Sequence, residues 1–155
     1  MKVSTLLTLI VFSSIFFSCD KDKKTSKRFF SVGQWTITEF QIDQDWIHPH
    51  RKVKIDSCSI YEEQCSGNWS YRLGTTTYSA NFNWQFNEKA KKFVLQGPGH
   101  CGTCTEETDL AANELNLISG TYHVTTNTKT QIHVESTTTW GYPGKRVFLK
   151  FEKNP

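Results

Sequence analysis

The pattern of apolar and polar positions predicts strands over most of the chain. Residues 81–87 read Asn-Phe-Asn-Trp-Gln-Phe-Asn, so apolar and polar side chains alternate without a fault. Successive side chains of a strand point to opposite faces, so this segment is predicted to be a strand with Phe82, Trp84 and Phe86 on one face. In a helix, neighbouring aromatics of this set would lie about 200° apart, and no face would be apolar.

Shorter alternating runs recur at the spacing typical of a barrel or a sandwich. They centre on Trp35 and Ile37, Phe93 and Leu95, Leu115 and Leu117, Tyr122 and Val124, Ile132 and Val134, and on Val147, Leu149 and Phe151. A change of phase after Ile37 predicts a β-bulge near Glu39. A turn at residues 87–89 predicts a hairpin. The sequence therefore predicts about eight strands in one all-β domain over residues 29–155.

One segment favours a helix instead. Residues 105–113 begin with Thr105 as a candidate N-cap, and acidic side chains follow in the first turn. Three tryptophans fall near predicted turns, where they are expected to surround an opening or to pack beneath loops. They are Trp46, Trp69 and Trp140.

The first eighteen residues carry the pattern of an export signal. Lys2 supplies one positive charge, residues 6–17 are mostly apolar, and the small Ser18 precedes Cys19. These are the three parts of a secretory signal peptide. A helix that spans a bilayer needs about 20 apolar residues, so this stretch is too short to span stably. We therefore expect residues 1–18 to be removed.

Residues 15–19 resemble the lipobox of bacterial lipoproteins, in which the cysteine becomes the first residue of the mature chain and is acylated. Phe16 and Phe17 depart from the commonest residues of that motif, and aromatic-rich variants occur in lipoproteins of the Bacteroidetes type. The resemblance implies that Cys19 carries the lipid. It also implies a location in the bacterial cell envelope, on the periplasmic face of the outer membrane or on the cell surface.

Residues 20–28 are polar and lack apolar periodicity, so residues 19–28 are expected to form a lipidated, flexible tether. Removing residues 1–18 takes away one of the 18 basic residues and none of the 15 acidic ones, which leaves a net charge of +2. This charge is too small to favour nucleic acid as a partner. The basic side chains of the tether are expected to be solvated and mildly attracted to anionic headgroups.

The domain opens with Gly33-Gln34-Trp35, the Gly-x-Trp of the first strand of lipocalins. Together with residues 83–86, 121–124, 129–135 and 145–153, this motif resembles the lipocalin-like domain of lipoproteins of the Bacteroidetes type. The resemblance covers most of residues 32–153 and implies a closed, antiparallel, up-and-down barrel of about eight strands. Such a barrel is either filled by its own side chains or holds one small ligand. Residues 47–50 and the Cys101–Cys104 loop depart from the pattern.

Four cysteines remain beyond Cys19, and disulfides are their first interpretation. The number is even, and export places the chain in an oxidising compartment. The candidates are Cys58, Cys65, Cys101 and Cys104, and all three pairings stay open. A zinc site would use the same thiolates, although only Cys101 and Cys104 have the short spacing that such sites favour. A redox Cys-x-x-Cys would need a preceding βαβ unit, which the sequence does not predict.

The sequence contains no motif for catalysis. A Gly-x-Ser-x-Gly elbow, a His-Glu-x-x-His pair and a phosphate-binding glycine loop are all missing from it. His48 and His50 precede two cations, so we expect an exposed loop there rather than a metal site. The sequence therefore predicts no enzyme activity, no catalytic residues, no metal and no cofactor.

Two functional hypotheses remain. In the first, the barrel binds a small hydrophobic or amphipathic molecule, with Trp35, Phe82, Trp84 and Phe86 as the candidate pocket residues. In the second, these side chains fill the core and the loops contact another envelope protein. A cavity of some hundreds of cubic ångströms would favour the first hypothesis. A solid interior with an exposed apolar loop patch would favour the second.

Overall fold

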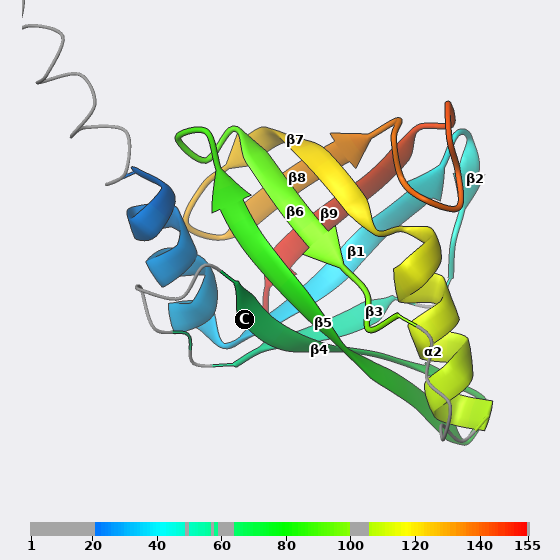
Figure 1. The fold of residues 1–155 in the computed structure, drawn as a ribbon. Coiled ribbons are helices and arrows are strands. Elements are labelled where there is room, and N and C mark those ends of the chain that lie inside the picture. The colour runs from blue at the N-terminus through cyan, green and yellow to red at the C-terminus, as the bar shows by residue number, and fades with distance from the viewer. Residues whose placement is uncertain (1–20, 49, 57, 59–63, 100–105, 155) are drawn as a thin grey trace, which may run out of the picture.

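A computed structural model describes residues 21–154, apart from residues 49, 57, 59–63 and 100–105. The described strands form one antiparallel sheet in the order β2-β1-β3-β4-β5-β6-β7-β8-β9. Strand β1 also pairs with β9, so eight of these strands close into a barrel, and the short β2 extends one edge of β1 (Figure 1). The predicted all-β, lipocalin-like barrel is confirmed.

The described elements follow one another along the chain with one helix between β6 and β7. They are β1 (Gln34–Ile42), β2 (Asp45–Trp46), β3 (Arg51–Ile55), β4 (Cys65–Leu73), β5 (Thr76–Asn87), β6 (Lys92–Gln96), α2 (Glu106–Leu117), β7 (Gly120–Asn127), β8 (Gln131–Ser136) and β9 (Val147–Lys153).

The clearest alternating segment lies where the pattern predicts it. In β5, Phe82, Trp84 and Phe86 are buried inside the barrel, while Asn81 and Asn83 are exposed. Residues 88–91 turn the chain from β5 into β6, which confirms the predicted hairpin. The register of β1 against β9 shifts between Ile37 and Glu39, which confirms the predicted bulge.

Strands β3 and β4 were not predicted from the sequence, because their inward positions are not uniformly apolar. Strand β3 begins with an inward Arg51, and β4 has Gly67 at an inward position because the ring of Phe82 lies against it. Trp69 belongs to β4 and is fully buried, so its predicted place near a turn is wrong.

The strand predicted around Leu115 and Leu117 is wrong, because both residues lie in α2. Leu115 is buried and Leu117 is partly exposed, as expected for helical positions that point in different directions. A single pair of leucines two residues apart is too short to distinguish a strand from a helix. The predicted helix is confirmed and extends to Leu117.

The segment expected to be a flexible tether is helical over residues 21–32. Thr25 and Phe29 lie one turn apart on the same helix face, and both are buried. Gly33 follows the helix with a φ of 74°, a left-handed conformation that glycine adopts readily at a helix end. The chain thereby turns directly into β1.

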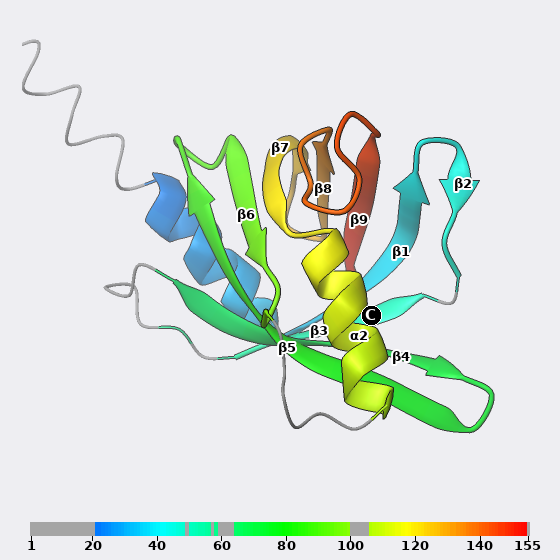
Figure 2. The same cartoon turned by 45° about the vertical axis from the view of Figure 1, so that its right-hand side comes forward.

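The two helices close opposite ends of the barrel. The helix of residues 21–32 lies at the end where β1 starts, which we call the base (Figures 1 and 2). Helix α2 lies across the other end, which we call the mouth, beside β4 and β5 (Figure 2). Neither of these helices reaches the length and apolar character that a membrane span requires.

Candidate ligand-binding site

The base of the barrel is filled by a side chain from outside the sheet. The ring of Phe29 enters from the helix of residues 21–32, and its centroid lies 4.8 Å from that of Trp84, 5.1 Å from that of Trp35 and 5.6 Å from that of Phe86. The indole nitrogen of Trp35 donates a hydrogen bond of 2.9 Å to the Phe29 carbonyl. This part of the interior is a packed aromatic cluster.

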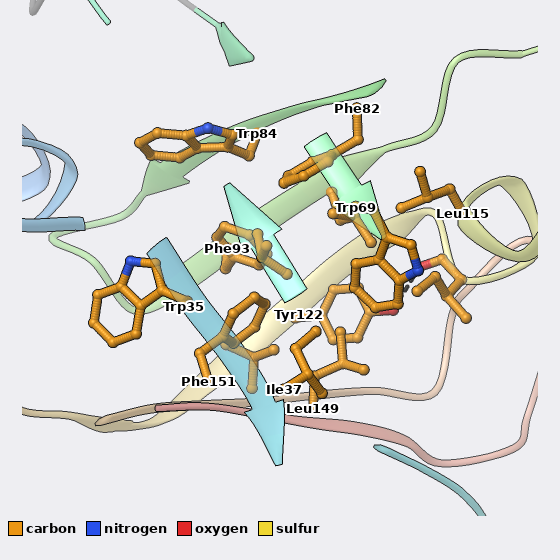
Figure 3. Packing of buried hydrophobic residues seen from close by; sticks show 14 of the residues in the cluster. Trp35, Ile37, Trp69, Phe82, Trp84, Phe93, Leu115, Tyr122, Leu149 and Phe151 are labelled. Atoms are coloured by element: carbon orange, nitrogen blue, oxygen red, sulfur yellow. Dashed lines mark hydrogen bonds between the residues drawn. The ribbon is translucent and has the colours of Figure 1, made fainter. Parts of the chain in front are cut away.

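The four candidate pocket residues are therefore divided between two environments. Trp35, Trp84 and Phe86 surround Phe29 at the base. Phe82 lies further toward α2, on the same side of the core as Trp69 and Leu115 (Figure 3). Their contact with a ligand stays a prediction, and of the four it is Phe82 that lies toward α2 (Figure 3).

The mouth contains a buried charge. Arg51, at the start of β3, points into the barrel and is 3% exposed, whereas its neighbour Lys52 is exposed. The Arg51 guanidinium lies over two aromatic rings, with its central carbon 4.5 Å from the Tyr71 centroid and 5.3 Å from the Phe40 centroid. Stacking of this kind orients a guanidinium and leaves its edge open to an anion.

Glu114 of α2 supplies that anion. Arg51 Nε donates a hydrogen bond of 3.0 Å to Glu114 Oε1, and a second guanidinium nitrogen contacts Oε2, so the pair is bidentate. The indole nitrogen of Trp69 also donates to Glu114 Oε1 at 2.7 Å. One carboxylate therefore ties the helix to two strands at the mouth.

The surroundings of Tyr71, which lies beside this ion pair, shift the pKa of its side chain. Desolvation raises the pKa of Tyr71, the negative charge of Glu114 raises it further, and the positive charge of Arg51 opposes both effects. Tyr71 stacks on Tyr78 of β5, with ring centroids 5.3 Å apart. We call Phe40, Arg51, Trp69, Tyr71 and Glu114 the Arg51 cluster.

Around the mouth, two of the three tryptophans predicted to lie near turns are exposed. Trp46 of β2 is 51% exposed and Trp140, in the loop between β8 and β9, is 78% exposed. His48 is exposed and stacks on Trp46, with ring centroids 6.5 Å apart, and His50 is exposed as well. Nowhere in the described part of the chain do three or more potential metal ligands gather.

The structure shows one of the candidate disulfides. Cys58 and Cys65 form a disulfide that links the loop after β3 to the start of β4. This bond removes two of the four thiolates that a zinc site would need. Cys101 and Cys104 lie outside the described residues, and so does Cys19.

Comparisons with known proteins bear on the fold. No protein-family model matches the chain, and a search of curated proteins gives no match. Among solved structures, Japanin from Rhipicephalus appendiculatus, in a crystal form bound to cholesterol, is similar with a TM-score of 0.52 and 8% sequence identity. The alignment covers 77% of this chain and 74% of that one. At this identity the likeness extends to the architecture alone.

The Arg51 cluster was not predicted from the sequence. A signal was present in residues 51–55. One face of this strand carries Arg51, Val53 and Ile55, and the other face carries two exposed lysines. An arginine in line with two β-branched residues indicates an inward charge. Its partner Glu114, however, lies 63 positions further along the chain, and only the fold brings the two together.

Proposed function

We propose that this chain is a lipoprotein anchored through Cys19 to the outer membrane of a bacterium, and that its barrel binds a small amphipathic molecule at the mouth. The anchoring rests on the sequence of residues 1–19, which resembles an export signal followed by a lipobox. The binding rests on the closed barrel and on the Arg51 cluster. We propose a binding role and no catalysis.

Arg51 is the observation that carries the binding proposal. A charged group inside a barrel is costly to desolvate unless it is paired, and apolar residues at the same position are often equally stable. The counter-ion of Arg51 comes from a helix, so it can leave with α2 while every strand pairing of the barrel stays intact. An acidic headgroup can then take the place of the Glu114 carboxylate.

The remaining part of such a ligand would replace the apolar face of α2. Ala111, Ala112 and Leu115 are the buried apolar residues of this helix. Leu115 lies on the side of the core that holds Trp69 and Phe82 (Figure 3). A hydrocarbon tail fits this aromatic lining, because pockets for small molecules combine mostly apolar walls with a few fixed polar groups. Japanin supports the proposal to the extent that a barrel of similar fold was crystallised with cholesterol.

The test compares a long-chain fatty acid with the corresponding alcohol, each carrying the same fluorescent group. We expect the acid to bind at least about tenfold more tightly, because the charge-assisted hydrogen bonds to Arg51 are worth about 1.5–3 kcal/mol. Lys52→Met, which removes the adjacent exposed cation, should leave this preference unchanged. Equal affinities for acid and alcohol, or no binding of either, would contradict the proposal.

A second candidate function rests on the exposed tryptophans. Trp46 and Trp140 present large apolar surfaces at the mouth, and exposed tryptophans are enriched in protein interfaces. On this hypothesis the loops contact another envelope protein. A photo-crosslinker placed at residue 140 in intact cells should then give one discrete adduct, while the same group at the exposed Lys129, in the turn after β7, should give none.

A further inference from the structure

The base of the barrel carries a cluster of lysines that we propose binds the anionic headgroups of the membrane surface. This inference rests on the proposed anchoring through Cys19, because the anchor decides which end of the barrel meets the bilayer. We call the cluster the basal surface. It consists of five of the exposed lysines of the helix of residues 21–32 and of the β5–β6 turn: Lys21, Lys24, Lys27, Lys89 and Lys91.

A specific contact joins the two parts of the basal surface. The backbone N–H of Ala90, in the β5–β6 turn, donates a hydrogen bond to the Asp22 carboxylate of the helix. Glu88, Lys89 and Ala90 all have φ between 53° and 60°, a left-handed turn in which the buried Ala90 faces the helix and its lysine neighbours face solvent. Figures 1 and 2 both place this turn beside the start of the helix.

The position of the predicted anchor brings this surface close to a bilayer. Only Asp20 separates Cys19 from Lys21, and two residues of fully extended chain span at most about 7 Å. The Debye length at physiological ionic strength is about 8 Å. The first turn of the helix and the β5–β6 turn bound to it therefore stay within the range at which headgroup charge is only partly screened.

The nearby acidic groups leave a positive excess. Two acidic residues lie there in the described part of the chain, Asp22, which accepts from the Ala90 N–H, and Glu88, which pairs with Lys92. The basal surface has five exposed lysines. An anionic surface would attract the base and so hold the mouth away from the membrane.

The experiment uses the chain from Asp20 onward, without acyl groups, because it contains every described element of the fold. Binding to vesicles is measured by co-sedimentation, with phosphatidylcholine alone and with about 30% phosphatidylglycerol, at about 0.05 M and about 0.5 M NaCl. We expect binding to the anionic vesicles at low salt and release at high salt. Lys89→Gln with Lys91→Gln should weaken the binding by more than about tenfold.

The matched control is Lys52→Gln with Lys145→Gln, which removes the same charge from exposed sites away from the base and should change binding by less than about twofold. Near-ultraviolet circular dichroism checks that both double variants are folded. Equal binding to neutral and anionic vesicles, equal losses in the two double variants, or no binding at all would overturn the proposal. Failure of the proposed anchoring would be seen in a separate measurement. Mass spectrometry of the full chain extracted from membranes would then show no mass from acyl chains.

Discussion

At the scale of single residues, Phe29 illustrates how one side chain can decide the state of a whole interior. Its ring is fully buried and meets aromatic rings from β1, β5, β6 and β9, including those of Phe93 and Phe151 at 5.9 Å and 5.7 Å. Edge-to-face contacts of this kind add to the free energy gained by burial. The helix of residues 21–32, which carries Phe29 and includes most of the predicted tether, is therefore part of the folded domain.

Phe29→Ala is expected to lower the free energy of unfolding by about 3–5 kcal/mol, because it leaves a cavity among aromatic rings that cannot collapse. The measurement is urea unfolding followed by circular dichroism. Phe30→Ala, one position along the same helix and only half-buried, is the control and should cost clearly less. Equal losses would mean that Phe29 does not fill the base.

Tyr122 provides a prediction about pH. Burial raises the pKa of this side chain well above its ordinary value near 10, and its hydroxyl donates a hydrogen bond to the Ile118 carbonyl. Above about pH 10, the unfolded chain releases this proton while the folded chain retains it, so alkali favours unfolding by up to about 1.4 kcal/mol per pH unit.

We expect Tyr122→Phe to be less stable than the native chain at pH 8, by about 1 kcal/mol for the lost hydrogen bond. The difference should shrink and then reverse as the pH approaches 11, because the variant no longer has this proton to lose. Denaturant unfolding at pH 8, 10 and 11 measures it. A difference that does not change with pH would contradict the assigned burial.

At the scale of elements, α2 is held to the barrel by a charged pair as well as by its apolar face. The helix offers a narrow apolar face, and Glu114 connects it to Arg51 and Trp69 on the neighbouring strands. Glycine at position 141 lets the β8–β9 loop approach the other end of the helix, since a Cβ there would collide with Leu117. The helix is thus held at two places on its length.

Glu114→Gln is expected to destabilise the protein by about 3 kcal/mol, because it replaces the carboxylate of a buried ion pair with Arg51 by a neutral amide. Amide hydrogen exchange should accelerate in α2 before it does in the barrel strands. Glu135→Gln removes a carboxylate from an exposed pair with Arg146 and should cost less than about 1 kcal/mol. Uniform acceleration over helix and strands would show that α2 does not open by itself.

At the scale of the whole molecule, the five tryptophans report the arrangement of the barrel directly. Trp35, Trp69 and Trp84 are almost fully buried in the interior, whereas Trp46 and Trp140 are exposed at the mouth. Fluorescence quenching by acrylamide should therefore resolve an accessible and a protected population.

Replacing both exposed tryptophans, as Trp46→Phe with Trp140→Phe, should abolish the accessible component and leave the protected one intact. The measurement is a Stern–Volmer plot, which should change from curved to nearly linear and shallow. Strong residual quenching in this variant would mean that one of the interior tryptophans reaches solvent and that the barrel is open.

Patterns that act over a few residues could be recognised from the sequence alone. The alternation through Phe82, Trp84 and Phe86, the bulge after Ile37 and the helix around Ala111 each depend on neighbours in the chain, so their physical signals are local. Strand β3 was missed because a local pattern treats Arg51 as an interruption. The cost of an inward charge depends on what surrounds it in space.

The sequence by itself determined the class of fold, the inward faces of the clearest strands and the candidates for the disulfides, because periodicity and residue type carry that information. Only the tertiary structure decided which residues meet in space. It placed Phe29 inside the base, joined Cys58 to Cys65 and brought Glu114 to Arg51 at the mouth. The physical reason is that these contacts depend on the path of the chain between elements and on where the two helices lie over the ends of the barrel, which local periodicity does not specify.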